Sequence, residues 1–78
     1  MDWHDYIHSN PDVLLGKPVI KGTRISVEML LELYAKGWDE GMILESYPML
    51  KSEALRAVFY YLQDCLQQER YFSLPQVG

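Results

Sequence analysis

This 78-residue sequence is poor in several features on which small proteins often depend. It has a single cysteine, Cys65, so neither an internal disulfide nor a zinc site built from several cysteines supplements its core. No apolar run approaches the ~20 residues of a membrane span, and the acidic start, MDWHDYIHS, does not follow the basic-then-apolar order of a signal peptide. We therefore expect a cytoplasmic protein.

Positive charge is also scarce, with seven Lys and Arg residues against eleven Asp and Glu and a formal net charge of −4. A molecule of this overall charge is repelled by nucleic acid, so DNA binding requires a local basic patch. The stretch GKPVIKGTRISV, residues 16–27, carries three of the seven cations and no acidic residue. It is therefore the first candidate for such a patch.

The composition is that of one small folded domain. Hydrophobic residues make up 49% and charged residues 23% of the chain, which are ordinary values for a globular protein. We predict a mainly α fold, a three-helix bundle with a helix-turn-helix joint and a short N-terminal β-hairpin. The domain is expected over residues 1–70, and residues 71–78, YFSLPQVG, are expected to form an extended tail.

The hairpin prediction depends on Lys21-Gly22, which lies between two short apolar runs. Glycine at the second position of a two-residue turn readily adopts the positive φ that such a turn requires. We therefore predict that residues 18–20 pair with residues 23–25. Pro18 lacks an N–H group and belongs at the start or edge of its strand.

Two short helices follow the hairpin. For the first, Ser26 is a suitable N-cap, an apolar stripe begins at Val27, and Gly37 provides a left-handed stop. For the second, Asp39 is the predicted N-cap, and Pro48 prevents the helix from continuing much beyond the residue before it.

A third helix is predicted from near Ser52 to about Arg70. At 1.5 Å per residue it is roughly 25 Å long, so we expect part of it to pack on another subunit. Its expected core stripe, read from the helical spacing, consists of Leu55, Val58, Phe59, Leu62, Cys65 and Leu66.

Polar residues that suit DNA contacts lie off this stripe, on the outer face of the third helix. Arg56, Tyr60 and Gln63 can contact phosphates or base edges, and Lys51 lies just before the helix. Glu53 lies among them and would repel phosphate. Any small three-helix bundle has a similar joint, so an ordinary structural role for this face stays open.

The basic stretch also has two interpretations. Lys17, Lys21 and Arg24 either hold a phosphate backbone or an acidic protein surface, or they belong to a solvated hairpin in which Arg24 pairs with Glu28.

Aromatic residues near the end of the third helix are candidates for a protein interface, where such residues are enriched. The partner-binding candidates are Tyr61, Arg70, Tyr71 and Phe72. Ordinary partial burial of the aromatic rings is the alternative.

No residues form a recognisable catalytic or metal-binding set. Cys65 lies on the apolar stripe without an evident base, and carboxylates such as Asp39 and Glu40 are explained by helix capping. His4 and His8 are four residues apart but lack a third ligand apart from nearby aspartates. The order of residues in GKPVIKGT differs from that of a phosphate-binding loop. We expect no enzyme, no cofactor, no metal and no small-molecule substrate.

Residues 7–62 resemble the domain of unknown function 433 family. The most specific matches are GKPVIKGTRISV, GWDEGMILESYPML and EALRAVFYYL. The resemblance implies a bacterial or archaeal homeodomain-like helix-turn-helix fold in a small dimeric protein, often the antitoxin partner of a PIN-like ribonuclease toxin. It implies that the third helix is the recognition helix, with Lys51 and Arg56 facing DNA, and that the C-terminal segment meets the toxin.

The chain departs from the family pattern at two places. Lys51 stands where the family commonly has threonine, which is expected to move the helix-capping role to Ser52. The tail after residue 70 is short, so it offers little of an extended toxin-wrapping segment.

The function expected from these features is that of an antitoxin-type regulator. It would be a homodimer that binds and neutralises a PIN-like toxin and binds its own operator DNA. The alternative is an interaction module that dimerises without contacting DNA.

Overall fold

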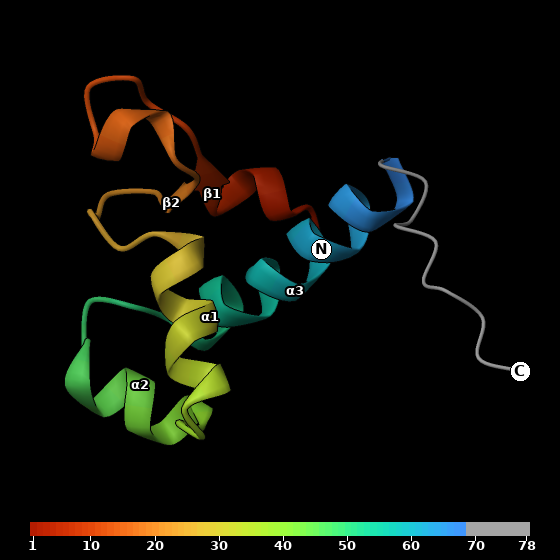
Figure 1. The fold of residues 1–78 in the computed structure, drawn as a ribbon. Helices are drawn as coiled ribbons and strands as arrows, with labels where there is room; N and C mark the ends of the chain where they lie inside the picture. The colour runs from red at the N-terminus through yellow and green to blue at the C-terminus, as the bar shows by residue number, and fades with distance from the viewer. Residues whose placement is uncertain (69–78) are drawn as a thin grey trace, which may run out of the picture.

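Figure 1 shows the computed structural model, which describes residues 1–68. The mainly α fold with three helices and a short antiparallel strand pair near the N-terminus is confirmed. The tail expected over residues 71–78 lies outside the described residues. In chain order the elements are the 3-10 helix η1 (Trp3–Asp5), β1 (Ile7–His8), the 3-10 helix η2 (Leu14–Gly16), β2 (Val19–Ile20), α1 (Val27–Ala35), α2 (Glu40–Ser46) and α3 (Ser52–Gln68).

The strand pair is not the one predicted. β2 pairs with β1, antiparallel, in a register that sets Ile7 opposite Ile20. The prediction that residues 23–25 form the partner strand is wrong, because that side of the turn contributes an isolated bridge between Val19 and Ser26. Ile7 and Ile20 are both buried in the core, so pairing with β1 covers apolar surface that a local hairpin would leave open.

The turn around Gly22 encloses four residues, 21–24, rather than the predicted two. Gly22 has the expected positive φ, +78°, and the Ile20 amide donates to the Ile25 carbonyl at 2.9 Å. The Thr23 hydroxyl donates to the Ile20 carbonyl at 2.8 Å and accepts from the Ile25 amide at 3.0 Å. Because Thr23 satisfies backbone groups on both sides, it holds the turn of residues 21–24, which we call the basic loop, in a defined shape.

α1 and α2 begin where the sequence predicts. Ser26 Oγ accepts from the Met29 amide at 3.0 Å, and Asp39 Oδ1 accepts from the Met42 amide at 2.9 Å. Each bond satisfies an amide that has no partner within the helix, a contribution of about 1 kcal/mol. Gly37, with φ +94°, follows the end of α1 as predicted.

Residues 47–51 join α2 to α3 and complete the helix-turn-helix pair. Leu50 is buried and fixes the joint to the core. The Lys51 carbonyl accepts from the Ala54 amide at 3.0 Å, the first bond of α3. Lys51 therefore occupies the cap position itself, and the expected shift of that role to Ser52 is wrong because Ser52 is already helical.

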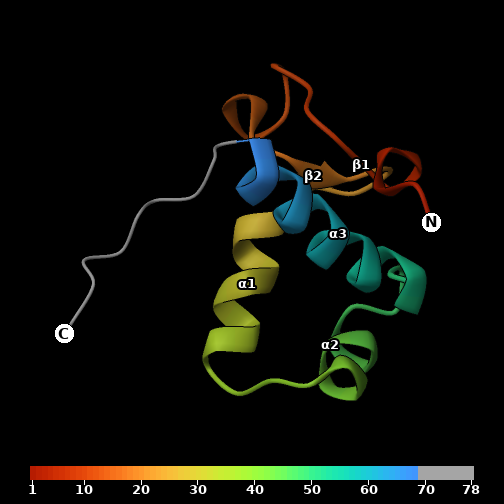
Figure 2. The ribbon, with the colours of Figure 1, turned by 90° about the vertical axis from the view of Figure 1, so that its right-hand side faces the viewer.

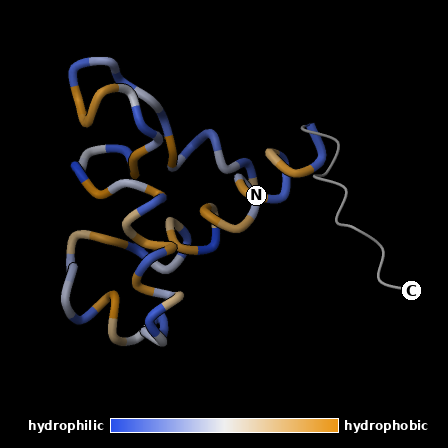
Figure 3. Tube along the Cα trace, in the orientation of Figure 1, coloured by the Kyte–Doolittle hydropathy of each residue, from blue (hydrophilic) through white to orange (hydrophobic). Residues whose placement is uncertain are grey.

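The fully buried residues of α3 all lie in its first half. Phe59 is 49% exposed and Leu66 is 53% exposed, so the prediction that these two residues belong to the core is wrong. Figures 1 and 2 show why: α3 continues beyond the other elements, and Figure 3 shows apolar segments still alternating with polar ones along its outer half. The α3 residues that are buried are Ala54, Leu55, Ala57 and Val58.

The N-terminal segment supports the second half of α3 from one side. The Trp3 indole N–H donates to the carboxylate of Asp64, and the Trp3 ring meets Tyr61 edge to face, with centroids 4.8 Å apart. These contacts join residues about 60 positions apart in sequence. The outer part of α3 therefore depends on η1, a dependence that helical periodicity does not reveal.

Candidate binding site

The structure brings the basic loop and the start of α3 to the same side of the molecule. Lys21, Arg24 and Lys51 are all exposed there, and we refer to these three residues as the basic face. They surround two shallow hollows that share one lining residue, Met49. Lys51 is 27 positions from Arg24 and 30 from Lys21 in the sequence, yet all three residues contribute to this surface.

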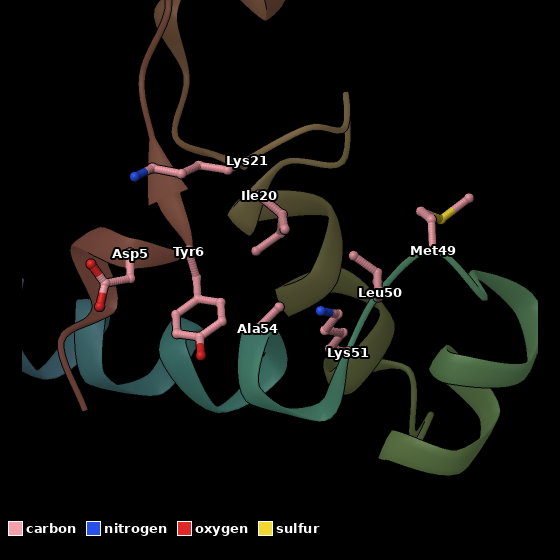
Figure 4. A pocket seen from close by; sticks show the side chains of 8 residues that line it. All are labelled: Asp5, Tyr6, Ile20, Lys21, Met49, Leu50, Lys51 and Ala54. Atoms are coloured by element: carbon pink, nitrogen blue, oxygen red, sulfur yellow. The ribbon is translucent and has the colours of Figure 1, made fainter.

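The first hollow has a volume of about 190 Å³ and is shown in Figure 4. Lys21 and Lys51 lie on opposite sides of it, and the Lys21 side chain extends over β1, away from Met49. Asp5 and the Tyr6 ring lie on the same side of the view as the Lys21 ammonium group. Its floor is formed by apolar residues of the buried core, Ile20, Leu50 and Ala54. Its lining consists of Asp5, Tyr6, Ile20, Lys21, Met49, Leu50, Lys51 and Ala54.

The second hollow, of about 480 Å³, lies beside the basic loop. Arg24 and Thr23 line it from the loop, and His8 lines it from β1. Met49, whose side chain is 60% exposed, stands between the two hollows. Together the two hollows place three cations and one carboxylate, that of Asp5, around an apolar centre.

Ion pairing separates Lys17 from the other basic residues. The Lys17 ammonium lies 3.0 Å from the Glu28 carboxylate, so Glu28 pairs with Lys17 rather than with Arg24 as one interpretation of the sequence had it. Within residues 1–68, no ion pair engages Lys21, Arg24 or Lys51. Because the three cations are not neutralised by acids of the described chain, they are available to an anionic partner.

The outer face of α3 forms a separate surface. Arg56, Tyr60 and Gln63 surround a shallow hollow of about 370 Å³ together with Phe59, and Lys51 does not line it. The four residues predicted to contact DNA are therefore divided between two surfaces.

Acidic groups lie close to this outer face. Arg56 and Glu40 line a neighbouring hollow, and Glu53 is exposed on the first turn of α3. Burial raises the pKa of Tyr34, which lines the same hollow, and the charge of Glu40 adds to the rise. Charge alone makes this face less favourable to phosphate than the basic face.

The predicted partner-binding residues fall into two groups. Tyr61 is half-buried and packs on Trp3 of its own chain, and this burial, with the neighbouring Cys65 thiol, raises the pKa of its phenol. Arg70, Tyr71 and Phe72 lie outside the described residues.

Two further observations concern residues 1–68. None of their helices is long and apolar enough to cross a membrane. Their His, Cys, Asp and Glu side chains form no cluster of three that is suited to a metal ion. His4 instead lies with its Nδ1 atom 2.7 Å from Asp2, a hydrogen bond that lowers the pKa of the Asp2 carboxyl.

Sequence reasoning missed three residues of this site. These residues are Met49, Asp5 and Tyr6, none of which the sequence analysis singled out as a site residue. Their proximity depends on the pairing of β1 with β2, which carries no local signal. The spacing of residues in the sequence likewise does not predict that the large apolar side chain of Met49 is exposed among cations.

A family model, a solved structure and a curated relative were found to be similar to this chain. The family model described as "Protein of unknown function (DUF433)" matches residues 7–61. The crystal structure at 2.00 Å resolution of a DUF433 member protein from Anabaena variabilis superposes with a TM-score of 0.72 and 32% sequence identity, over 80% of this chain and 61% of that one. An uncharacterized protein, y4eO, from Sinorhizobium fredii is 34% identical over 59 residues, which are 76% of this chain and 27% of the relative. The chain thus spans about a quarter of the length of that relative.

Proposed function

Because this chain belongs to the DUF433 family of proteins of unknown function, and because of its basic face, we propose that it is a non-enzymatic, antitoxin-type regulator. In this proposal it binds and neutralises a PIN-like ribonuclease toxin in the cytoplasm and binds its own operator DNA. We assign the basic face to DNA and an exposed arginine with neighbouring apolar residues to the toxin. Arg24, which belongs to the basic face, is a candidate for both contacts.

The observation that carries the proposal is the grouping of Lys21, Arg24 and Lys51 in a chain whose net charge is −4. Three of the seven Lys and Arg residues line the two hollows, and Asp5 is the one carboxylate among the described residues that line them. Lysine and arginine contacts to phosphates supply most of the affinity of a protein for DNA and fix its orientation. A grouped set therefore supports binding that the overall charge opposes.

The proposed toxin contact follows from the chemistry of PIN-like ribonucleases, which the resemblance implies have an acidic, metal-binding cleft. An arginine inserted into that cleft forms charge-assisted, bidentate bonds with its carboxylates and competes with the metal ion. Arg24 and Arg56 are exposed, and Arg70 is the third candidate in the sequence.

Alanine substitutions at these three arginines test the toxin contact. Each variant would be co-expressed with a PIN-like ribonuclease, the class of partner that this proposal names, and RNA cleavage would be measured. We expect one substitution to weaken toxin binding by at least roughly 30-fold, since truncating one partner of a buried charge pair leaves the other unpaired. Lys36→Ala removes an exposed cation at the far end of α1 and is the matched control. Full neutralisation by all three arginine variants would rule out insertion into the cleft.

A second candidate function is that of a protein-interaction module that does not contact DNA. The exposed Phe59, Tyr60 and Leu66 of α3 favour it, because large apolar side chains gathered on one helix are typical of interaction sites. A mobility shift with DNA from upstream of the gene distinguishes the two functions, since this module would produce no salt-sensitive shift.

A further inference from the structure

Met49 is an exposed apolar residue in the middle of the basic face. It lines one hollow together with Lys21 and Lys51, and it lines the other together with Arg24. Its side chain is 60% exposed, and Figure 4 shows it projecting away from the joint between α2 and α3. The Met49 side chain therefore contributes little to the core of its own chain and is free to contact a partner.

The backbone on the C-terminal side of Met49 is held in place. The Leu50 amide donates to the Tyr47 carbonyl at 2.9 Å, and the Leu50 side chain is buried. The Lys51 carbonyl then accepts the first hydrogen bond of α3. An exposed side chain on a turn that is already ordered loses little backbone entropy when it meets a partner. The joint thus presents Met49 in a preorganised position.

We propose that Met49 lies in the major groove of bound DNA and selects thymine through the C5-methyl group of that base. This inference rests on the proposed DNA binding by the basic face, and it adds the base that the face selects. Lys21, Arg24 and Lys51 contact the phosphates that border the groove, and Met49 contacts the base edges between them.

The chemistry of the methionine side chain identifies the base. Its thioether donates no hydrogen bond and accepts one only weakly, so it cannot pair with the donors and acceptors of a base edge. The thymine methyl group is the apolar feature that distinguishes one base pair from another in the major groove. The flexible, polarisable methionine chain adapts readily to such a group. Met49 therefore discriminates between bases through thymine.

The arrangement of charge favours duplex DNA over other anionic partners. Phosphates border the major groove on both sides and the bases lie between them, which matches cations in both hollows and an apolar side chain shared by the two. The major groove is about 12 Å wide and admits protein elements, whereas the minor groove is about 6 Å wide. RNA helices have a narrow major groove that side chains do not read, and uracil lacks the methyl group.

The test is a mobility shift with DNA from upstream of the gene and with the same DNA carrying deoxyuridine in place of every thymidine. The wild type should bind the deoxyuridine DNA at least roughly fourfold more weakly, the effect of losing one buried methyl group. Met49→Ala should respond by less than about twofold, and Met49→Leu should keep most of the wild-type response. Met42→Ala is the matched control, because Met42 is 44% exposed on α2 and lies outside both hollows. It should respond as the wild type does.

Equal responses of the wild type and Met49→Ala to the deoxyuridine DNA would overturn the thymine contact, whether both lose affinity or neither does. Salt dependence separates this outcome from a failure of the proposed function. Met49→Ala retains all three cations of the basic face, so its slope of log K against log salt should equal that of the wild type. A wild-type slope near zero would overturn DNA binding by this face, and the thymine contact with it.

Discussion

Replacing Lys21, Arg24 and Lys51 together with alanine is expected to weaken binding to operator DNA by roughly 100- to 1000-fold at about 0.1 M salt. Each phosphate contact releases about 0.9 counterion on binding, so each contact contributes nearly tenfold to affinity at this salt concentration. The three residues form no ion pair with residues 1–68, so their removal leaves no described acid without a partner. Affinity would be measured by mobility shift.

Lys36→Ala is the control for the triple variant. It removes one exposed cation from the end of α1, away from the basic face, and should reduce affinity by less than about threefold. Far-UV circular dichroism would establish that the triple variant is folded. If the triple variant binds the operator as tightly as the wild type, the basic face does not contact DNA.

Trp3→Ala is expected to lower the free energy of unfolding by about 2 kcal/mol, a decrease in Tm of about 8–16 °C for a domain of this size. The substitution removes the aromatic contact with Tyr61 and the hydrogen bond to Asp64, which together hold the N-terminal segment against α3. Trp3 is half-buried, so the effect is smaller than for an aromatic residue enclosed in a core. Thermal unfolding followed by circular dichroism measures it.

Trp3→Phe separates the two contacts. Phenylalanine retains a ring against Tyr61 but cannot donate to the Asp64 carboxylate, so it should recover about half of the lost stability. A Trp3→Ala protein with unchanged Tm would show that η1 does not stabilise α3.

The helices were predictable because their signals are local. Ser26 and Asp39 cap α1 and α2 through side chains that reach only three residues ahead, and Gly37 supplies a positive φ where α1 ends. Such features depend on neighbours in sequence, which are neighbours in any fold. Their positions therefore followed from the sequence without knowledge of the tertiary structure.

The strand pairing and the basic face were not predictable in the same way. β1 pairs with β2 because Ile7 and Ile20 can both be buried there, a condition that involves the whole core. This pairing then places Asp5 and Tyr6 beside Lys21, and Lys51 arrives from the other side. The ion pair of Glu28 with Lys17 rather than Arg24 likewise depends on loop geometry that residue spacing does not fix.

The stripe on α3 shows the limit of periodicity. The spacing of Leu55, Phe59, Leu62 and Leu66 identified residues that share one side of a helix. It did not indicate that the elements packed on α3 cover this side incompletely, which leaves Phe59 and Leu66 half-exposed. The length of α3 relative to so small a domain indicated that part of the helix extends beyond the elements that pack on it, and the expectation that another subunit covers this part stays a prediction.

The central claim is that the basic face binds the phosphate backbone of DNA, and its most direct test is the salt dependence of operator binding by the wild-type protein. Between about 50 and 200 mM salt, three phosphate contacts per copy predict a slope of log K against log salt of about −2.7 per bound copy. The triple alanine variant should lose most of that slope. A wild-type slope near zero, or equal slopes for the two proteins, would contradict the claim.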